Sequence, residues 1–274
     1  MMNILTEEEI EQLALGIFAD DLQYNEVLYG PDLLRELNEV ILKSTLQTAI
    51  EQLNPELNAE LREEAFRMAT RAISPSLNVN NENFHTYLTE GIDVKGTDTN
   101  GQVKTFKAWL IDYKMPSNNI FSVVNQFTVV ENQNNKRADI ILFINGLPLV
   151  VIEIKNAADE RATTKTAFDQ LQTYKQAIPN LFNYNAFLIA TDGWFAKAGT
   201  ITSDYSRFST WKSQDLPEIP QSIVAESDEI YNSTLFPKSS QSPEMETMFK
   251  GMLNKATLLD LIRHFIVFEK TKDK

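Results

Sequence analysis

The sequence predicts an α/β fold in which helices flank a central mixed β-sheet. The main evidence is two β-prone apolar runs, 138–144 and 147–154, joined by Asn145-Gly146, a dipeptide typical of tight hairpin turns. Patterns with helical periodicity precede and follow these runs along the chain. With 274 residues and 43% hydrophobic content, the chain can bury a full core.

The amino-terminal part is expected to form a helical front before the sheet. Thr6-Glu7-Glu8-Glu9 has the pattern of a capping box, which opens a helix. The inward stripe of this helix is expected to comprise Ile10, Leu13, Ala14, Ile17 and Phe18. Further helices are predicted from Asp32 to about Gln52, from Pro55 to Ala72 and from Asn83 to Thr89, followed by strands over 102–113 and 122–131.

The segment after the hairpin predicts a loop, a helix and another strand. Thr163 or Thr164 is a suitable N-cap for a helix that continues to about Lys175. A strand over 186–190 then ends at the turn Thr191-Asp192-Gly193.

The carboxy-terminal part is expected to be a short helical tail. The Pro/Ser-rich segment 236–243 has the composition of a linker. It would divide a main domain, residues 1–235, from residues 244–274, whose patterns predict helices over 244–254 and 257–268.

Composition excludes several classes of site. The chain has no cysteine, which rules out disulfides and thiol-ligated zinc, and its two histidines, His85 and His264, have no ligand spacing. Neither a secretory leader nor an apolar run long enough to span a membrane occurs, so we expect a cytoplasmic protein.

Three charged residues in the most strand-like part of the chain predict a site. Strand alternation sets Glu153 and Lys155 on one face, and the hairpin brings Asp139 close to them. Two carboxylates, with the Ile154 carbonyl as a further ligand, suit Mg²⁺ or Mn²⁺. Such a metal can polarise a phosphoryl oxygen and activate water, while Lys155 positions that water or neutralises developing charge. The alternative is an ordinary strand in which these charges only pair with one another.

The following helix is expected to bring two more polar groups to this site. Gln170 and Tyr174 are four residues apart and therefore neighbours on one helix face. The alternative is that Tyr174 belongs to the core.

The order Asp139, Glu153-Ile154-Lys155 and Gln170-x-x-x-Tyr174 resembles the PD-(D/E)xK nuclease superfamily. It is most similar to the amino-terminal nuclease domain of the restriction (R) subunits of type I restriction-modification enzymes, a resemblance that extends over 121–129, 145–156, 190–193 and 258–269. The resemblance implies a restriction-endonuclease-like fold that cleaves double-stranded DNA with a divalent metal. Asp139 and Glu153 would bind the metal, Lys155 would be the catalytic lysine, and Gln170 and Tyr174 the accessory pair. Related nucleases often add a glutamate from their first helix, for which Glu11 is the candidate.

Two departures qualify the resemblance. Position 138 is alanine rather than the proline of the superfamily name, and no G-x-x-x-x-G-K-[ST] phosphate loop occurs, so no ATP site is expected in this chain. The chain resembles the piece that precedes the motor domain, and the implied partners are that motor and the methylation and specificity subunits. Two alternatives stay open: a nuclease-like module that has lost cleavage and serves in DNA binding or assembly, and a repair or resolvase nuclease of the same superfamily.

The net charge of −13 argues against a self-sufficient DNA-binding protein. Most of this charge lies at the front, because residues 1–60 hold thirteen acidic residues against Arg35 and Lys43. Weak DNA affinity in isolation is therefore expected. The candidate phosphate contacts, which ordinary solvated surface would equally explain, are Lys136, Arg137, Arg161 and Lys165, around Lys155.

Overall fold

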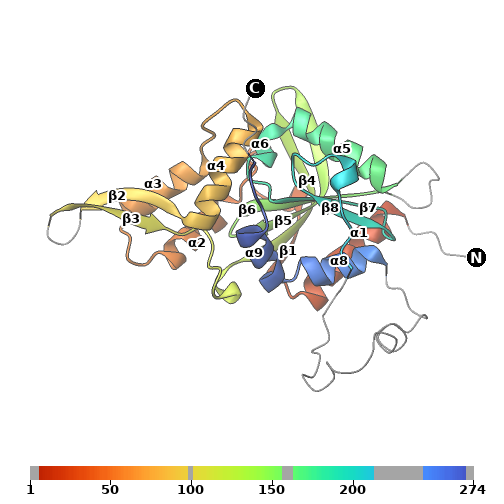
Figure 1. Cartoon of the computed structure of the whole chain (residues 1–274), viewed down its shortest axis with the longest axis horizontal. Helices are drawn as coiled ribbons and strands as arrows, with labels where there is room; N and C mark the ends of the chain where they lie inside the picture. The colour runs from red at the N-terminus through yellow and green to blue at the C-terminus, as the bar shows by residue number, and fades with distance from the viewer. Residues whose placement is uncertain (1–5, 98–100, 156–162, 213–242, 270–274) are drawn as a thin grey trace, which may run out of the picture.

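The computed structural model describes residues 6–97, 101–155, 163–212 and 243–269. Its centre is a six-stranded mixed sheet with the strand order β1-β4-β5-β6-β7-β8 (Figure 1). The strands are β1 (Glu26–Tyr29), β4 (Phe121–Glu131), β5 (Asn134–Ile144), β6 (Leu147–Ile154), β7 (Phe187–Thr191) and β8 (Ala196–Gly199). β1 pairs with β4 and β6 with β7 in parallel, and the other neighbours are antiparallel. This architecture confirms the predicted α/β class.

Helices pack against the central sheet, and α2, α3 and α4 form a helical region to one side of it (Figure 1). α5 packs on β5, β6 and β7, whereas α1 packs on β4 and β6. A second sheet, β2 (Ile92–Thr97) with β3 (Val103–Ala108), packs on α3. The helices are α1 (Glu7–Gly16), α2 (Lys43–Leu53), α3 (Ala59–Thr70), α4 (Leu77–Glu90), α5 (Thr164–Ala177), α6 (Pro179–Phe182), α8 (Glu244–Met252) and α9 (Lys255–His264). In the described part of the chain, none of the helices combines the length and apolar character of a membrane span.

The β5–β6 hairpin is the centre of the sheet and forms as predicted. Asn145 and Gly146 have φ values of 53° and 79°, as a two-residue type I′ turn requires. A side chain at Gly146 would also lie only 2.4 Å from the Leu42 carbonyl oxygen. Every residue of β6 is buried, which agrees with its continuous apolar sequence.

The helix predicted from Asp32 to about Gln52 is wrong in its first half. Residues 33–42 form no helix, and α2 begins at Lys43. Tertiary contacts take up the backbone groups of this segment, since Leu37 O accepts from Val130 N at 2.9 Å and Leu42 N donates to Gly146 O at 3.0 Å. The Arg35 guanidinium also lies 3.7 Å from the centroid of the Phe127 ring. Helical periodicity is a weak preference, and pairing with the sheet overrides it here.

Other boundaries differ from the predicted ones. The capping box of α1 is present, but Leu13 is 52% exposed and so does not belong to the inward stripe. The strand predicted over 102–113 is shorter and belongs to the second sheet, where it pairs with β2. The sequence patterns did not predict β1, β2 or β8, each of which has only four to six residues.

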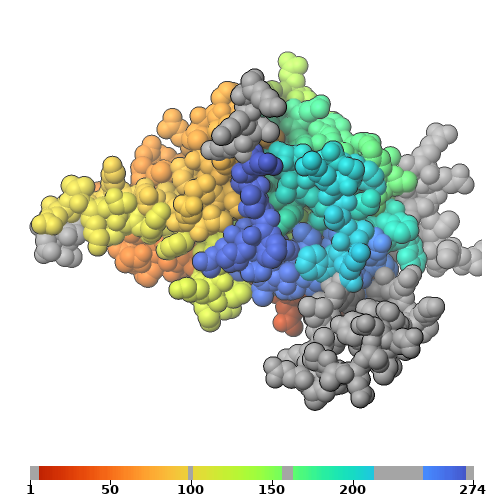
Figure 2. Space-filling model, in the orientation of Figure 1, coloured from red at the N-terminus to blue at the C-terminus, as the bar shows by residue number. Residues whose placement is uncertain are grey.

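The carboxy-terminal helices pack on the rest of the molecule. Figure 2 shows them, in blue, filling the surface between the amino-terminal helices and the segment around β8. Phe249 of α8 stacks on Phe18 with ring centroids 5.3 Å apart, and the Tyr24 hydroxyl donates to Leu253 O at 2.8 Å. The predicted linker lies outside the described residues except for Pro243. The division at 236–243 stays a prediction.

Phe249→Ala tests whether this tail folds with the main domain. Phe249 is fully buried, so its truncation is expected to lower the free energy of unfolding of the whole chain by about 3–5 kcal/mol. Urea denaturation followed by circular dichroism measures this change. Phe265→Ala is the control, because Phe265 is 67% exposed and its loss should change the free energy by less than about 0.5 kcal/mol. An unchanged main transition in Phe249→Ala would show that the tail is a separate unit.

Candidate active site

Asp139 and Glu153 lie next to each other across the β5–β6 hairpin. Ile140 pairs with Ile152, and extending this register by one residue sets Asp139 opposite Glu153. Asp139 Oδ2 accepts a hydrogen bond from Ile154 N at 2.8 Å, which fixes the orientation of its carboxylate. Glu153 is only 1% exposed. The structure thus brings together the two carboxylates singled out in the sequence.

The Lys155 ammonium donates hydrogen bonds to two of the oxygens that are expected to bind the metal. Its Nζ is 2.7 Å from Glu153 Oε1 and 3.1 Å from Ile154 O. Glu153 Oε2 is buried and has no hydrogen-bond partner among the described residues. A positive charge therefore already lies beside these oxygens, and one buried carboxylate oxygen still lacks a partner. This donor set fits a small hard cation bound by two carboxylates and a carbonyl. Across the described ranges, no three or more Asp, Glu, His or Cys side chains gather as a metal site.

The buried carboxylates have strongly raised pKa values. Burial raises the pKa of Glu153 to about 8, the Asp139 charge adds to this effect, and Lys155 opposes it. Burial also raises the pKa of Asp139 to about 6, although the hydrogen bond from Ile154 N lowers it. Perturbed carboxylates of this kind are concentrated at functional sites, because charge that destabilises the fold is otherwise unfavourable. The pair therefore needs a proton or a cation to be stable at neutral pH.

Glu153→Gln is expected to stabilise the metal-free chain at alkaline pH. A carboxyl group whose pKa rises on folding, here from 4.5 to about 8, binds its proton more tightly in the folded state. The stability that it contributes is present below about pH 4.5 and is lost as the pH rises toward 8. In EDTA at pH 8.5 the variant should exceed wild type by about 2 kcal/mol, because the loss of the Lys155 pair offsets part of the gain. At pH 4.5 the two proteins should be similar.

Urea denaturation at both pH values measures this difference. Glu56→Gln, at an exposed position, is the control and should change stability little at either pH. A Glu153→Gln chain that is less stable than wild type at pH 8.5 would contradict the raised pKa.

α5 places Tyr174 beside the carboxylates and Gln170 next to Tyr174. Thr163 caps this helix, as predicted. Tyr174 is 4% exposed and its hydroxyl donates to Arg137 O at 2.8 Å. Burial raises the pKa of Tyr174, and the charges of Glu153 and Asp139 act in the same direction, while a hydrogen bond with Gln170 opposes them. Tyr174 is thus both a core residue and a neighbour of the site, so the two interpretations of its pattern are compatible.

A cleft of about 520 Å³ opens beside Asp139. Glu11 of α1 lines it and is 7% exposed, but its Oε1 accepts from Asn125 Nδ2 at 2.7 Å and its Oε2 accepts from Gln126 Nε2. The structure brings Glu11 to the cleft, and its role as a third metal ligand stays a prediction. The other lining residues are Glu7, Glu8, Gln12, Tyr29, Asn125, Gln126, Arg137, Asp139 and Ile154.

Asn125 and Gln126 are site residues that the sequence patterns did not single out. They place two adjacent amide side chains within the apolar strand 121–130, and this interruption is the sequence feature that could have marked them as site residues. Gln126 also has a φ of 54°, unusual for a strand residue. Together they hold the Glu11 carboxylate at the edge of the cleft.

The predicted phosphate contacts are only partly placed around this site. Arg137 lines the cleft and is exposed, and Lys136 precedes it on β5. Lys165 pairs with Asp169 on α5 and lies 5.2 Å from the centroid of the Phe168 ring. Arg161 lies outside the described residues. Their contact with DNA stays a prediction.

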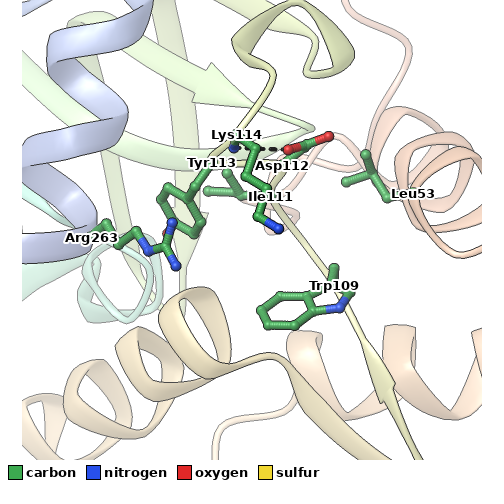
Figure 3. Close-up of a pocket in the computed structure, with 7 residues that line it drawn as sticks. All are labelled: Leu53, Trp109, Ile111, Asp112, Tyr113, Lys114 and Arg263. Atoms are coloured by element: carbon green, nitrogen blue, oxygen red, sulfur yellow. Dashed lines mark hydrogen bonds between the residues drawn. The ribbon is translucent and has the colours of Figure 1, made fainter.

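A second pocket, of about 270 Å³, lies away from the carboxylates. Figure 3 shows Arg263 of α9 beside the Tyr113 ring, with Trp109 on the other side of the pocket. The Arg263 guanidinium carbon lies 5.1 Å from the centroid of the Tyr113 ring. The remaining lining residues are Leu53, Ile111, Asp112 and Lys114. None of the predicted catalytic residues lines it, so the candidate active site is the cleft at Asp139.

Comparison with known proteins shows the family of this chain. Residues 4–207 match the family described as type I restriction enzyme R protein N terminus. This chain belongs to that family. The HindI endonuclease subunit of a type I restriction enzyme from Haemophilus influenzae is 35% identical over 97% of the chain and 24% of its own length. A Methanocaldococcus jannaschii relative, provisionally named as the MjaIXP endonuclease subunit, is 30% identical over 89% of the chain and 24% of its own length.

The family match confirms the resemblance predicted from the sequence. The matched range contains all of the predicted site residues, and the chain corresponds to the amino-terminal part of an R subunit. It spans about a quarter of the length of the two relatives.

Proposed function

We propose that this chain is the nuclease module of a type I restriction enzyme and hydrolyses phosphodiesters of double-stranded DNA with a bound Mg²⁺ or Mn²⁺. The observation that carries the proposal is the arrangement of Asp139, Glu153 and Lys155 at one end of the sheet, where the buried Glu153 Oε2 has no hydrogen-bond partner within the described ranges. Family membership supports the restriction role. The motor domain, the methylation and specificity subunits and a cytoplasmic location belong to the same proposal.

In this proposal each residue of the site has a different role in the reaction. Asp139, Glu153 and the Ile154 carbonyl would hold the ion, which supplies a Lewis acid and lowers the pKa of a water molecule that it binds. The Ile154 N–H orients the Asp139 carboxylate. The Lys155 ammonium, within 3.1 Å of two of these oxygens, is placed to stabilise negative charge on a phosphoryl group. Tyr174 fixes the backbone at Arg137, two residues before Asp139.

The alternatives fit the same observations less well. A module used only for DNA binding or assembly has no need of buried carboxylates whose ionisation destabilises the fold. A repair or resolvase nuclease would share the site, but the family match favours a restriction enzyme.

Isothermal titration of Mn²⁺ or Mg²⁺ tests the proposal. Wild type is expected to bind the ion, and Asp139→Asn and Glu153→Gln are expected to lose at least tenfold in affinity while keeping the wild-type circular dichroism spectrum. Asp93→Asn is the matched control, because Asp93 lies on the exposed side of β2. The absence of binding by wild type across millimolar metal, or equal binding by Asp139→Asn, would reject the site.

A further inference from the structure

The turn between β7 and β8 carries two large exposed aromatic side chains at the active-site end of the sheet. Trp194 is 53% exposed and Phe195 is 59% exposed. Lys155 N donates to Thr191 O at 2.9 Å, and the pairing of β6 with β7 sets Glu153 beside Ala190. The aromatic pair is therefore only a few residues along the chain from groups that contact the candidate catalytic lysine and glutamate.

Hydrogen bonds hold this turn in one conformation. Asp192 is buried, and its Oδ1 accepts from Trp194 N at 3.0 Å and from Phe195 N at 2.8 Å. The Thr191 hydroxyl donates to Phe195 O at 2.8 Å, and Trp194 O accepts from Glu244 N of α8 at 2.7 Å. Gly193 has a φ of 90°, a conformation that favours glycine, and a Cβ at this position would lie 3.0 Å from Ile10 Cδ1 of α1. The aromatic side chains are thus presented to solvent by a fixed scaffold, as exposed apolar contact surfaces often are.

The same hairpin adds a positive charge beside the candidate active site. Lys197 of β8 pairs with Ala190, which pairs with Glu153, so these residues form one row across the sheet. Two strand spacings separate Lys197 from Glu153, about 10 Å. Its Nζ lies 4.5 Å from the centroid of the Tyr205 ring. Lys165 of α5 contacts the same ring at 5.7 Å.

Charge also indicates the side from which a polyanion can approach. The α1 side of the cleft carries Glu7, Glu8 and Glu11, which repel phosphates. The β8 side carries Lys197 and Lys165, which both lie over the half-buried Tyr205 ring, and Lys165 also pairs with Asp169. Lysines bind phosphates, and aromatic side chains stack on bases or insert between base steps.

We propose that the β7–β8 hairpin is a contact surface for duplex DNA, in which Trp194 and Phe195 pack on bases or sugars near the cleaved phosphodiester and Lys197 binds a neighbouring phosphate. The inference rests on the proposed nuclease function. It assigns a DNA-contacting role to residues outside the cleft and places the duplex over the β8 side of the sheet.

Fluorescence anisotropy of a labelled 30-base-pair duplex, in EDTA and low salt so that binding is measured without cleavage, tests this surface. Trp194→Leu and Phe195→Leu are each expected to weaken binding at least fivefold. Lys197→Gln should weaken binding and reduce the slope of log affinity against log salt by about 1. Two matched controls should bind as wild type does: Phe265→Leu, an exposed phenylalanine on the tail, and Lys104→Gln, an exposed lysine on β3.

Several results would overturn the inference. They are wild-type affinity in Trp194→Leu and Phe195→Leu, equal losses in the two controls, or no measurable affinity of wild type for the duplex. In the first case the aromatic pair serves another partner, such as a protein surface. Metal titration of the same proteins separates the two proposals, since failure of the hairpin inference leaves metal binding and its loss in Asp139→Asn intact. Failure of the nuclease function removes metal binding itself.

Discussion

Lys155→Met is expected to lower the rate of DNA cleavage about 100- to 1,000-fold in a restriction complex assembled with the full-length subunit. The size follows from the loss of one preorganised positive group beside developing charge on a phosphoryl group. The Lys155 Nζ lies 2.7 Å from Glu153 Oε1, so the lysine belongs to the same site as the carboxylates. The loss is expected in kcat rather than in KM, because the interaction strengthens as charge develops.

Metal affinity distinguishes a catalytic lysine from one that only shapes the site. The Lys155 ammonium donates to Glu153 Oε1 and to Ile154 O, which are two of the proposed metal-ligand atoms. Its removal should therefore leave the affinity for Mn²⁺ unchanged or higher. Lys104→Met, at an exposed position on β3, should keep the wild-type rate and affinity. If the cleavage rate and metal affinity of Lys155→Met fall together, the lysine acts by organising the ligands, and an unchanged rate would exclude it from catalysis.

Asn145→Ala is expected to lower the free energy of unfolding by about 3–5 kcal/mol, since it removes several buried hydrogen bonds at once. The Asn145 amide donates to Leu110 O at 2.8 Å and to Asn119 Oδ1 at 2.9 Å, and its Oδ1 accepts from Ile120 N at 2.8 Å. Asn145 is fully buried, so the partner groups that lose their hydrogen bonds in the variant cannot bond to water instead. It joins the β5–β6 turn to the segment that leads into β4.

Two further variants separate the backbone effect from the hydrogen bonds. Asn132→Ala is the matched control, because Asn132 has a similar φ of 55° in an exposed turn, and it should cost about 1 kcal/mol. Asn145→Gly removes the same bonds without the positive-φ strain and should remain strongly destabilised. Urea denaturation measures all three variants. If Asn145→Gly were as stable as wild type, the hydrogen bonds would not be what holds this turn.

The sequence by itself determined the central hairpin, the helix that follows it and the two carboxylates. These features depend on short-range rules: the left-handed conformations that Asn145-Gly146 adopts, the alternation of side chains along a strand, and the cap at Thr163. The turn pairs Ile144 with Leu147, but a register shift between Leu142 and Phe143 moves the pairing by one residue, and this shift sets Asp139 opposite Glu153. The sequence therefore predicted that the two carboxylates lie near each other, whereas the shift in the folded hairpin decided that they face each other.

Only the tertiary structure decided the features that depend on partners far along the chain. Residues 33–42 do not form a helix, because backbone groups of Leu37 and Leu42 form hydrogen bonds with β4 and with the β5–β6 turn instead. Glu11 meets Asn125 and Gln126 across more than a hundred residues, and Phe249 meets Phe18 across more than two hundred. Short strands such as β1 and β8 carry too few residues for a pattern, and pairing with β4 and β7 stabilises them. Local preferences amount to fractions of a kcal/mol per residue, so the burial and hydrogen bonds of distant contacts overrule them.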